Sequence, residues 1–217
     1  MDIGYLQRVE LFAGLSEDEL ATIAAGAKLR SFPKNAVVIT QGDESNTLYV
    51  VVEGKLKVYM SDEEGKEVIL DFLREGDYFG ELALLDAAPR MASVMAVDAS
   101  QLGIIPGAHF LGCLRDNPQI GINLMATLAR RMRSLADNVS SLALMDVYGR
   151  VAQVLLRESH EAGGQRVMER LTHQEIANMV GASREMVSKI LKDLKIGGYL
   201  EVDDRSIVIK ERLPARW

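Results

Sequence analysis

The chain of 217 residues has room for one large or two small domains, and its composition, 48% apolar and 26% charged, excludes a disordered or collagen-like chain. The formal net charge of −6 at first argues against a nucleic-acid partner. No run reaches about eighteen apolar residues, and the N-terminus lacks a basic stretch followed by an apolar one, so we expect no membrane span, no signal peptide and a cytoplasmic location.

The charge is unevenly distributed along the chain. Residues 147–217 carry twelve Lys or Arg and ten Asp or Glu, whereas residues 1–146 carry thirteen and twenty-one. The C-terminal part is therefore slightly basic and the N-terminal part strongly acidic. This asymmetry indicates two domains with different partners.

The first part of the chain is predicted to be a short helix followed by a β-domain. Ser16 and Glu19 form a capping box before an Ala-rich apolar run, which predicts a helix to Ala27. From Ala36 to Pro106, short apolar runs alternate with glycines, the spacing of an all-β domain. Residues 62–66 are expected to form a hairpin loop between two of these strands.

A long helix is predicted to begin at Pro118, because apolar residues recur every three or four positions. This spacing is close to the 3.5-residue repeat of a coiled coil and favours pairing with a second copy, although packing on the chain's own β-domain remains open. The predicted seam comprises Ile120, Leu124, Leu128, Met132, Leu135, Val139, Leu142 and Met145.

Residues 79–94, FGELALLDAAPRMASV, combine the parts of an anion site. Gly80 permits a tight turn, and Glu81–Leu85 is expected to form one helical turn whose free N–H groups suit an anion. Arg90 supplies a fork of donors for a phosphate, and Glu81 an acceptor for a ribose hydroxyl. From these residues alone, an Arg90–Glu81 ion pair that closes the β-domain is equally possible.

Residues 171–197 have the pattern of a helix-turn-helix. Thr172 with Glu175 caps the first helix, Gly181 allows the turn, and Ser183 caps the second helix. The outward face of the second helix carries the residues expected to reach base edges in the major groove, namely Arg184, Glu185, Ser188 and Lys189. Phosphate contacts are expected from Thr172, His173, Gln174, Ser183 and Lys192. Residues 200–209 read as a hairpin, a wing on which Arg205 is a further phosphate contact.

Together these motifs resemble the cyclic-AMP receptor protein (CRP/FNR) family of bacterial transcription regulators over nearly the full length. Residues 79–94 are similar to the phosphate-binding cassette of cyclic-AMP-binding modules, and Thr172–Glu175 and Ser183–Glu185 match the family's DNA-contacting segment. The resemblance implies an α+β fold in three parts. These are a cyclic-nucleotide-binding β-roll (jelly-roll-like) in residues 1–116, a long dimerisation helix with a hinge in 117–145, and a winged helix-turn-helix in 146–217.

The resemblance also implies a function. The protein would be a homodimer regulated allosterically by cyclic AMP (cAMP), binding a palindromic TGTGA-like site in double-stranded DNA, with RNA polymerase as a further partner. Glu81 would bind the ribose 2′-hydroxyl and Arg90 the cyclic phosphate. The other ligand contacts would come from Gly80, Leu82, Ala83, Met91 and Arg131.

Two positions depart from the family pattern. Leu135-Ala136 stands where cAMP sensors carry a Thr-Ser pair that contacts adenine, so Leu135 would face the base without a hydroxyl. Lys189 stands where cAMP receptors usually carry arginine, which predicts looser readout of one base. Two alternatives stay open: cyclic di-GMP as the ligand, using Arg130, Arg131, Arg133 and Asp137, or a DNA-binding protein that needs no ligand.

Other chemistries find little support in the sequence. The single cysteine, Cys113, excludes a disulfide framework or an iron–sulfur cluster held by one chain, and its leucine-rich surroundings favour a core position. His109, His160 and His173 lack metal-ligand spacing, so we predict neither a metal nor a haem. A nucleophile with a nearby base is not recognisable, and we predict that the protein is not an enzyme.

Overall fold

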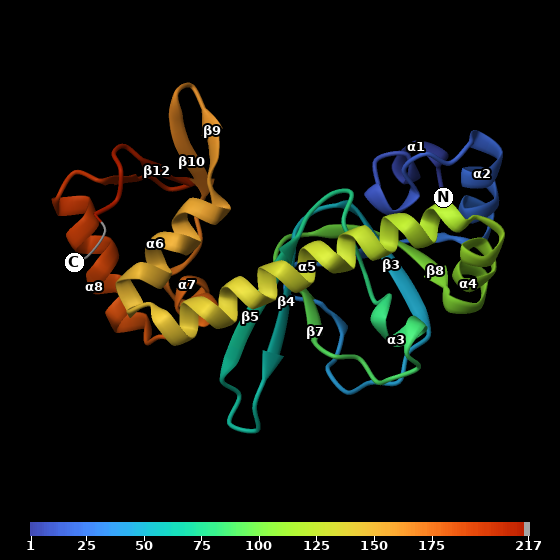
Figure 1. The fold of residues 1–217 in the computed structure, drawn as a ribbon, viewed down its shortest axis with the longest axis horizontal. Helices are drawn as coiled ribbons and strands as arrows, with labels where there is room; N and C mark the ends of the chain where they lie inside the picture. Colours follow the sequence, from blue (N-terminus) through green and yellow to red (C-terminus); the bar gives the residue numbers. More distant parts are fainter. Residues whose placement is uncertain (215–217) are drawn as a thin grey trace. The chain divides into compact units, whose positions relative to one another are not determined.

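The computed structural model describes residues 1–214 and divides into two compact units, residues 1–132 and residues 133 onward (Figure 1). The division falls inside α5 (Pro118–Leu144), one continuous helix that begins at the predicted proline. The boundaries predicted at residues 116 and 145 stay a prediction. Among the described residues, no helix combines the length and the apolar character that a membrane span requires.

The first unit contains two four-stranded antiparallel sheets, which confirms the predicted β-domain. One sheet has the order β1 (Lys28–Phe32), β8 (Ser100–Pro106), β3 (Thr47–Glu53) and β6 (Tyr78–Phe79). The other has the order β2 (Val37–Ile39), β7 (Ser93–Ala96), β4 (Leu56–Ser61) and β5 (Glu67–Leu73). Several neighbours, such as β1 and β8 or β2 and β7, are far apart in sequence, so distant segments of the chain lie side by side in the roll.

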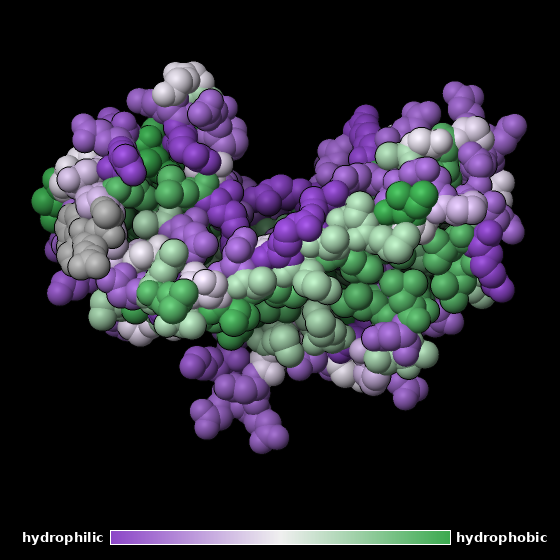
Figure 2. All heavy atoms as spheres, in the orientation of Figure 1, coloured by the Kyte–Doolittle hydropathy of each residue, from purple (hydrophilic) through white to green (hydrophobic). Residues whose placement is uncertain are grey.

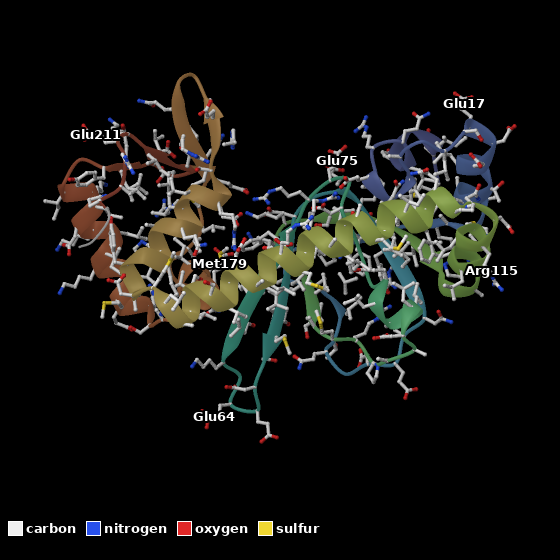
Figure 3. The ribbon with its side chains drawn as sticks, viewed as in Figure 1. Glu17, Glu64, Glu75, Arg115, Met179 and Glu211 are labelled. Carbon is white, nitrogen blue, oxygen red and sulfur yellow. The ribbon has the colours of Figure 1, made fainter. Side chains whose placement is uncertain are left out.

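The predicted hairpin loop at residues 62–66 joins β4 to β5. Gly65 has a φ of +79°, and the Asp62 carboxylate accepts hydrogen bonds from the backbone N–H groups of Glu64 and Lys66. Glu64 lies at the tip of this hairpin (Figure 3). An Asx-type turn with glycine in the left-handed region thus closes the hairpin.

Helices at the N-terminus and after β8 cover the first sheet. They are α1 (Ile3–Leu6), a 3-10 turn (Glu10–Phe12), α2 (Glu17–Gly26) and α4 (Gly107–Asp116). The capping box predicted for α2 is present, with the Ser16 N–H donating to Glu19 Oε2 at 2.7 Å. These helices shield the apolar face of the sheet from water.

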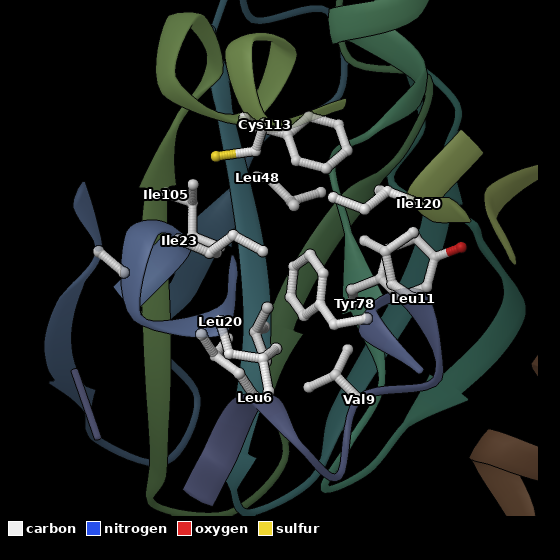
Figure 4. Packing of buried hydrophobic residues seen from close by; sticks show 14 of the residues in the cluster. Leu6, Val9, Leu11, Leu20, Ile23, Leu48, Tyr78, Ile105, Cys113 and Ile120 are labelled. Atoms are coloured by element: carbon white, nitrogen blue, oxygen red, sulfur yellow. The ribbon is translucent and has the colours of Figure 1, made fainter. Parts of the chain in front are cut away.

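The main core of the first unit lies between this sheet and its covering helices (Figure 4). Leu6, Leu48, Ile105 and Phe110 are almost completely buried there, and Ile120 and Leu124 of α5 belong to the same cluster. The first part of the predicted dimer seam therefore packs on the chain's own β-roll. The physical reason is that the first turns of α5 complete a core that the small β-domain cannot close alone.

The second unit continues with three helices and a third antiparallel sheet. The helices are α6 (Val147–Glu158), α7 (His173–Val180) and α8 (Arg184–Ile196). The sheet has the order β11 (Leu200–Val202), β12 (Ser206–Ile209), β10 (Gln165–Glu169) and β9 (His160–Ala162). The hairpin of β9 and β10 was not predicted, although Gly163-Gly164 between them is a turn signal; both glycines have positive φ.

Candidate nucleotide cradle and DNA interface

Gly80 joins β6 to the single helical turn α3 (Leu82–Leu85), as predicted. Its φ is +88°, and a Cβ atom there would lie 2.6 Å from Arg90 Nη1 and 2.8 Å from the Thr47 carbonyl oxygen. Both the backbone conformation and the close approach of Arg90 therefore require glycine. The turn brings Glu81 and α3 next to the guanidinium of Arg90.

Arg90 is buried in this cradle, with only 4% of its surface exposed. Its Nη1 donates to the Gly80 carbonyl at 2.7 Å, and its Nη2 to Ser45 Oγ at 2.8 Å and to the Thr47 carbonyl at 2.7 Å. Its Nε is buried and has no partner among residues 1–214. Burial lowers the pKa of this guanidinium, and nearby acidic groups, Glu81 among them, oppose the shift. A buried cation with a spare donor suits a phosphate.

Glu81 is buried as well, at 2% exposure, and its partner is Arg131 of α5. Arg131 Nη1 lies 2.6 Å from Glu81 Oε1, Nη2 donates to the Tyr78 carbonyl at 2.9 Å, and the guanidinium stands 5.1 Å from the centre of the Tyr78 ring. Burial raises the pKa of Glu81, and the charge of Arg131 works against that shift. Glu81 thus pairs with Arg131, while Arg90 binds backbone carbonyls, so the alternative of an Arg90–Glu81 pair is wrong.

The other predicted ligand contacts differ in how far they are exposed to solvent. Leu82 and Ala83 are half-buried on α3, and Met91 is exposed beside Arg90. Leu135 is exposed and belongs to the second unit, so its assignment as a base contact stays a prediction. The structure therefore brings Gly80, Glu81 and Arg90 together with Arg131.

Sequence analysis missed the residues that hold the two charged groups in place. Ser45 and Thr47 bind Arg90 from more than forty positions away, and Tyr78 supplies both a carbonyl and a ring to Arg131. Two of these four contacts use backbone oxygens, which any residue type provides. A motif search carries no signal for them.

In the second unit, α7 and α8 form the predicted helix-turn-helix. Thr172 caps α7 with a capping box, Gly181 ends it in the left-handed region at φ +62°, and the Ser183 hydroxyl accepts from the Met186 N–H. The predicted inner face of α8 is buried and comprises Val187, Ile190, Leu191 and Leu194. The pair of helices is thus fixed by its caps and by one apolar seam.

The predicted DNA contacts lie at the outer side of this pair. Arg184, Glu185, Lys189 and Lys192 are exposed on α8, and Ser188 is half-buried between them. Thr172, His173 and Gln174 at the start of α7, and Ser183 before α8, are exposed too. The arrangement presents charged and polar donors from two helix N-termini to one partner, as a nucleic-acid interface requires.

His173 and Ser188 are linked across the two helices. His173 Nδ1 lies 2.7 Å from Ser188 Oγ. Partial burial lowers the pKa of His173, and the neighbouring cations Arg184 and Arg170 lower it further. Both effects favour the neutral form of the His173 imidazole.

The predicted wing is the hairpin of β11 and β12, with Arg205 exposed in its loop. The Asp203 carboxylate accepts from the backbone N–H groups of Arg205 at 2.7 Å and Ser206 at 2.6 Å, and these bonds lower the pKa of Asp203. The backbone N–H of Arg170 donates to the Arg205 carbonyl at 2.9 Å. Arg170 thereby ties the wing to the segment that leads into α7.

Cys113 and His109, which were considered as a cluster or metal ligand in the sequence, both lie on α4 and contact the interior of the first unit. Cys113 is buried on α4, and burial raises the pKa of its thiol. His109 Nε2 lies 3.1 Å from the Thr22 carbonyl and 3.3 Å from the Ile23 carbonyl, at the C-terminal end of α2. Within residues 1–214, no three His, Cys, Asp or Glu side chains gather as metal ligands.

Comparison with known proteins identifies both units. Residues 29–117 match the cyclic nucleotide-binding domain family, and residues 149–213 match the Crp-like helix-turn-helix domain family. The first match contains Gly80, Glu81 and Arg90, and the second contains α7, α8 and the wing. This combination defines a transcription regulator with a cyclic-nucleotide-binding domain and a DNA-binding domain.

Curated relatives and solved structures agree with that class. The chain is 33% identical to the CRP-like cAMP-activated global transcriptional regulator of Mycobacterium tuberculosis over 97% of both chains. It is 36% identical to the cAMP-activated global transcriptional regulator CRP of Escherichia coli over 83% of this chain and 89% of that one. The structure is similar to that of the c-di-GMP responsive regulator CLP of Xanthomonas campestris, with a TM-score of 0.78, 25% identity and coverage of 91% and 100%. Another similar structure, the catabolite activator protein of Thermus thermophilus, has a TM-score of 0.57, 31% identity and coverage of 93% and 94%.

The chain belongs to the CRP/FNR family of transcription regulators. The family's members are regulators and not enzymes, in agreement with the prediction. The α+β fold with its β-roll and helix-turn-helix is confirmed as well. A cyclic nucleotide as the ligand class and DNA as the partner follow from the two domains.

Proposed function

We propose that the protein is a homodimeric transcription regulator that binds a palindromic, TGTGA-like DNA site when cAMP occupies the β-roll. A regulator of this kind acts in the cytoplasm, where bacterial DNA and RNA polymerase are found. The observation that carries the proposal is the cradle, in which two buried and oppositely charged residues, Arg90 beside Gly80 and Glu81 at the start of α3, lie close to the same turn.

The cradle fits a ribose 3′,5′-cyclic phosphate chemically. Arg90 offers its unpartnered Nε and a charge that a phosphate monoanion would neutralise. The first N–H groups of α3 have no acceptor inside their own helix and add donors on the same side. Glu81 offers a carboxylate that can accept from a ribose hydroxyl once it shares or exchanges its bond with Arg131.

The cradle residues contact the phosphate and the ribose and do not specify the base of the ligand. One position in the sequence favours a ligand other than cAMP. Leu135-Ala136 offers no hydroxyl where the family's cAMP sensors contact adenine. The structural relative from Xanthomonas campestris is described as c-di-GMP responsive. We therefore keep cyclic di-GMP as the alternative ligand, with Arg130, Arg131, Arg133 and Asp137 as the candidate contacts.

Dimerisation is supported by the apolar positions of α5 that the chain itself leaves exposed. Ile122, Met125, Met132 and Val139 are more than half exposed, and Ala129 and Ala136 fill the steps between them. The spacing is three, four, three, four and three residues, the repeat of a coiled-coil seam. Hydrophobic residues, coloured green, lie along α5 in Figure 2. The stripe shares Met132 and Val139 with the seam predicted from sequence, whose first residues, Ile120 and Leu124, lie in the core instead.

A two-fold dimer would present two copies of α8 to DNA. Half-sites one helical turn apart, about 34–36 Å, would then match the symmetry of the protein. Arg184 can bridge guanine O6 and N7, and Glu185 can accept from cytosine N4. Lys189 supplies a point charge and no planar fork, which predicts weaker selection at its base.

Isothermal titration calorimetry with full-length, nucleotide-free protein tests the ligand. We expect cAMP to bind with micromolar or tighter affinity at about one molecule per chain, and Arg90→Leu to abolish binding. Arg30→Leu, which removes an exposed arginine of the same unit, is the matched control and should bind as the wild type does. Absence of heat at two temperatures, together with binding of cyclic di-GMP, would replace cAMP by the alternative ligand.

A further inference from the structure

The hydrogen bond between His173 and Ser188 joins two different kinds of predicted DNA contact. His173 stands in the first turn of α7, where phosphate contacts are expected, and Ser188 stands on the base-facing side of α8, between Glu185 and Lys189. The 2.7 Å separation of Nδ1 and Oγ is that of a well-formed bond. Any change at the histidine ring therefore acts on a side chain placed to contact a base.

A serine hydroxyl has only one proton to donate. If Nδ1 of His173 carries a lone pair, Ser188 donates to the ring, and its oxygen can then only accept from DNA. If Nδ1 carries a proton, the ring donates to Ser188, and the hydroxyl proton is free for an acceptor on a base. The protonation of one imidazole nitrogen thus exchanges the two hydrogen-bonding roles of the hydroxyl.

The charges around the ring make its protonation sensitive to DNA. Arg184 of α8 and Arg170, in the segment before α7, are the charged groups that act on His173, and both are cations. Arg170 also forms an ion pair with the wing, in which its Nη1 lies 3.7 Å from Asp204 Oδ1. DNA phosphates at the start of α7 would bring negative charge to the same place, which favours the protonated imidazole.

We propose that His173 is a positioning residue that sets whether Ser188 accepts or donates at a base edge, and that DNA binding shifts it towards the donating state. In the free protein at neutral pH the ring carries its single proton on Nε2, and Ser188 donates to Nδ1. Against DNA the ring takes up a second proton on Nδ1, and Ser188 donates to the base. The inference rests on the proposed DNA interface and adds to it a specificity that depends on pH.

The first test measures DNA affinity at pH 6 and pH 8 for half-sites that carry each of the four bases at every position. We expect the preference at one position to change with pH by about 2- to 10-fold, the discrimination of a single hydrogen bond. His173→Asn and Ser188→Ala should both remove this change. His160→Asn, which replaces an exposed histidine of β9, is the matched control and should retain it.

The opposing outcome is equally clear. If the pH effect is the same on every sequence, including non-specific DNA, and survives Ser188→Ala, then His173 is a phosphate contact alone and the proposal is overturned. If the wild-type protein shows no specific DNA binding in the presence of either cyclic nucleotide, that result would instead contradict the proposed function. The two failures are therefore distinguishable.

A second test does not involve DNA. The chain has three histidines, so nitrogen-15 labelling of histidine gives a spectrum in which each ring can be assigned by substitution. We expect a neutral His173 with its proton on Nε2, whose Nδ1 resonance shifts in Ser188→Ala while His109 and His160 do not respond. A neutral ring with its proton on Nδ1, or a resonance that does not respond to Ser188→Ala, would overturn the proposal.

Discussion

Arg131 and Glu81 lie fifty positions apart in sequence and form a 2.6 Å ion pair in which the carboxylate is buried and the guanidinium is partly exposed. The pair ties the cradle to helix α5 inside the first unit. A ribose hydroxyl that bound Glu81 would compete with Arg131 for the same oxygens. Ligand binding would therefore be felt first at Arg131, on the helix that continues into the second unit.

The first prediction concerns the pH dependence of stability. Because the pKa of Glu81 is raised above its ordinary value of 4.5, the folded protein holds that proton more tightly than the unfolded chain. The free energy of unfolding therefore falls as pH rises from 4.5 through the folded-state pKa. Removing Arg131 raises the pKa of Glu81 further and extends this loss to higher pH.

We expect Arg131→Leu to lose stability more steeply than the wild type as pH rises above 4.5, and Arg131→Leu with Glu81→Gln to lack this additional pH dependence. Breaking a buried pair by removing one partner typically costs about 3–5 kcal/mol, and the exposure of Arg131 places this case below that range. Urea denaturation at a series of pH values measures the free energy of unfolding of each protein. Parallel profiles for all three proteins would show that the Glu81 carboxylate does not depend on Arg131.

The second prediction compares two glycines of positive φ. Gly80→Ala would place a Cβ against Arg90 and the Thr47 carbonyl, whereas a Cβ at Gly65 would meet no atom within 4 Å. Gly65→Ala should lose only the stability that a left-handed backbone costs a residue with a Cβ atom, about 1–2 kcal/mol. Gly80→Ala should lose more and should also weaken nucleotide binding, because Arg90 must move. Thermal unfolding measures the loss of stability, and calorimetry measures nucleotide binding. If both variants lost the same stability, the close approach of Arg90 to Gly80 would not be a reason for glycine at that position.

The third prediction addresses the exposed stripe of α5. Met132→Asp and Val139→Asp place a charge on the proposed seam, and we expect the protein to become monomeric at micromolar concentration because an aspartate at a core seam position must be desolvated. Ser134→Asp, an exposed position on the opposite face of the heptad, should leave the dimer intact. Analytical ultracentrifugation gives the mass. A wild type that is already monomeric would refute the seam outright.

The fourth prediction separates base contacts from phosphate contacts on α8. Arg184→Ala should lose about 1–3 kcal/mol of discrimination at one guanine and leave other positions unchanged. Lys195→Ala, which removes an exposed cation at the far end of the same helix, should leave the base preference unaltered. Competition binding with singly substituted sites provides the comparison. A uniform loss across all sequences would assign Arg184 to a phosphate.

Local signals in the sequence explain which elements were predicted correctly. The capping boxes at Ser16 and Thr172 and the turn at Gly181 depend on residues within three or four positions, and each is present in the structure. The run from Gly80 to Arg90 is also local, because one turn and one helical segment bring its ends together. Short-range chemistry of this kind can be recognised without a fold.

Long-range relationships could not be recognised in the same way. The apolar residues of α5 have one periodicity but two partners: Ile120 and Leu124 face the β-roll, and Met125 and Met132 are left exposed. Periodicity alone does not separate these faces, because both recur every three or four residues. The pairing of Glu81 with Arg131 likewise depends on how α5 crosses the β-roll.

The most direct test of the central claim is the fluorescence anisotropy of a labelled palindromic TGTGA-like site, measured with full-length protein while cAMP is added. The account predicts weak binding without nucleotide and a saturable increase whose midpoint lies at micromolar cAMP or below, absent in Arg90→Leu. Full specific binding without any nucleotide, or an Arg90→Leu protein that responds as the wild type does, would contradict it.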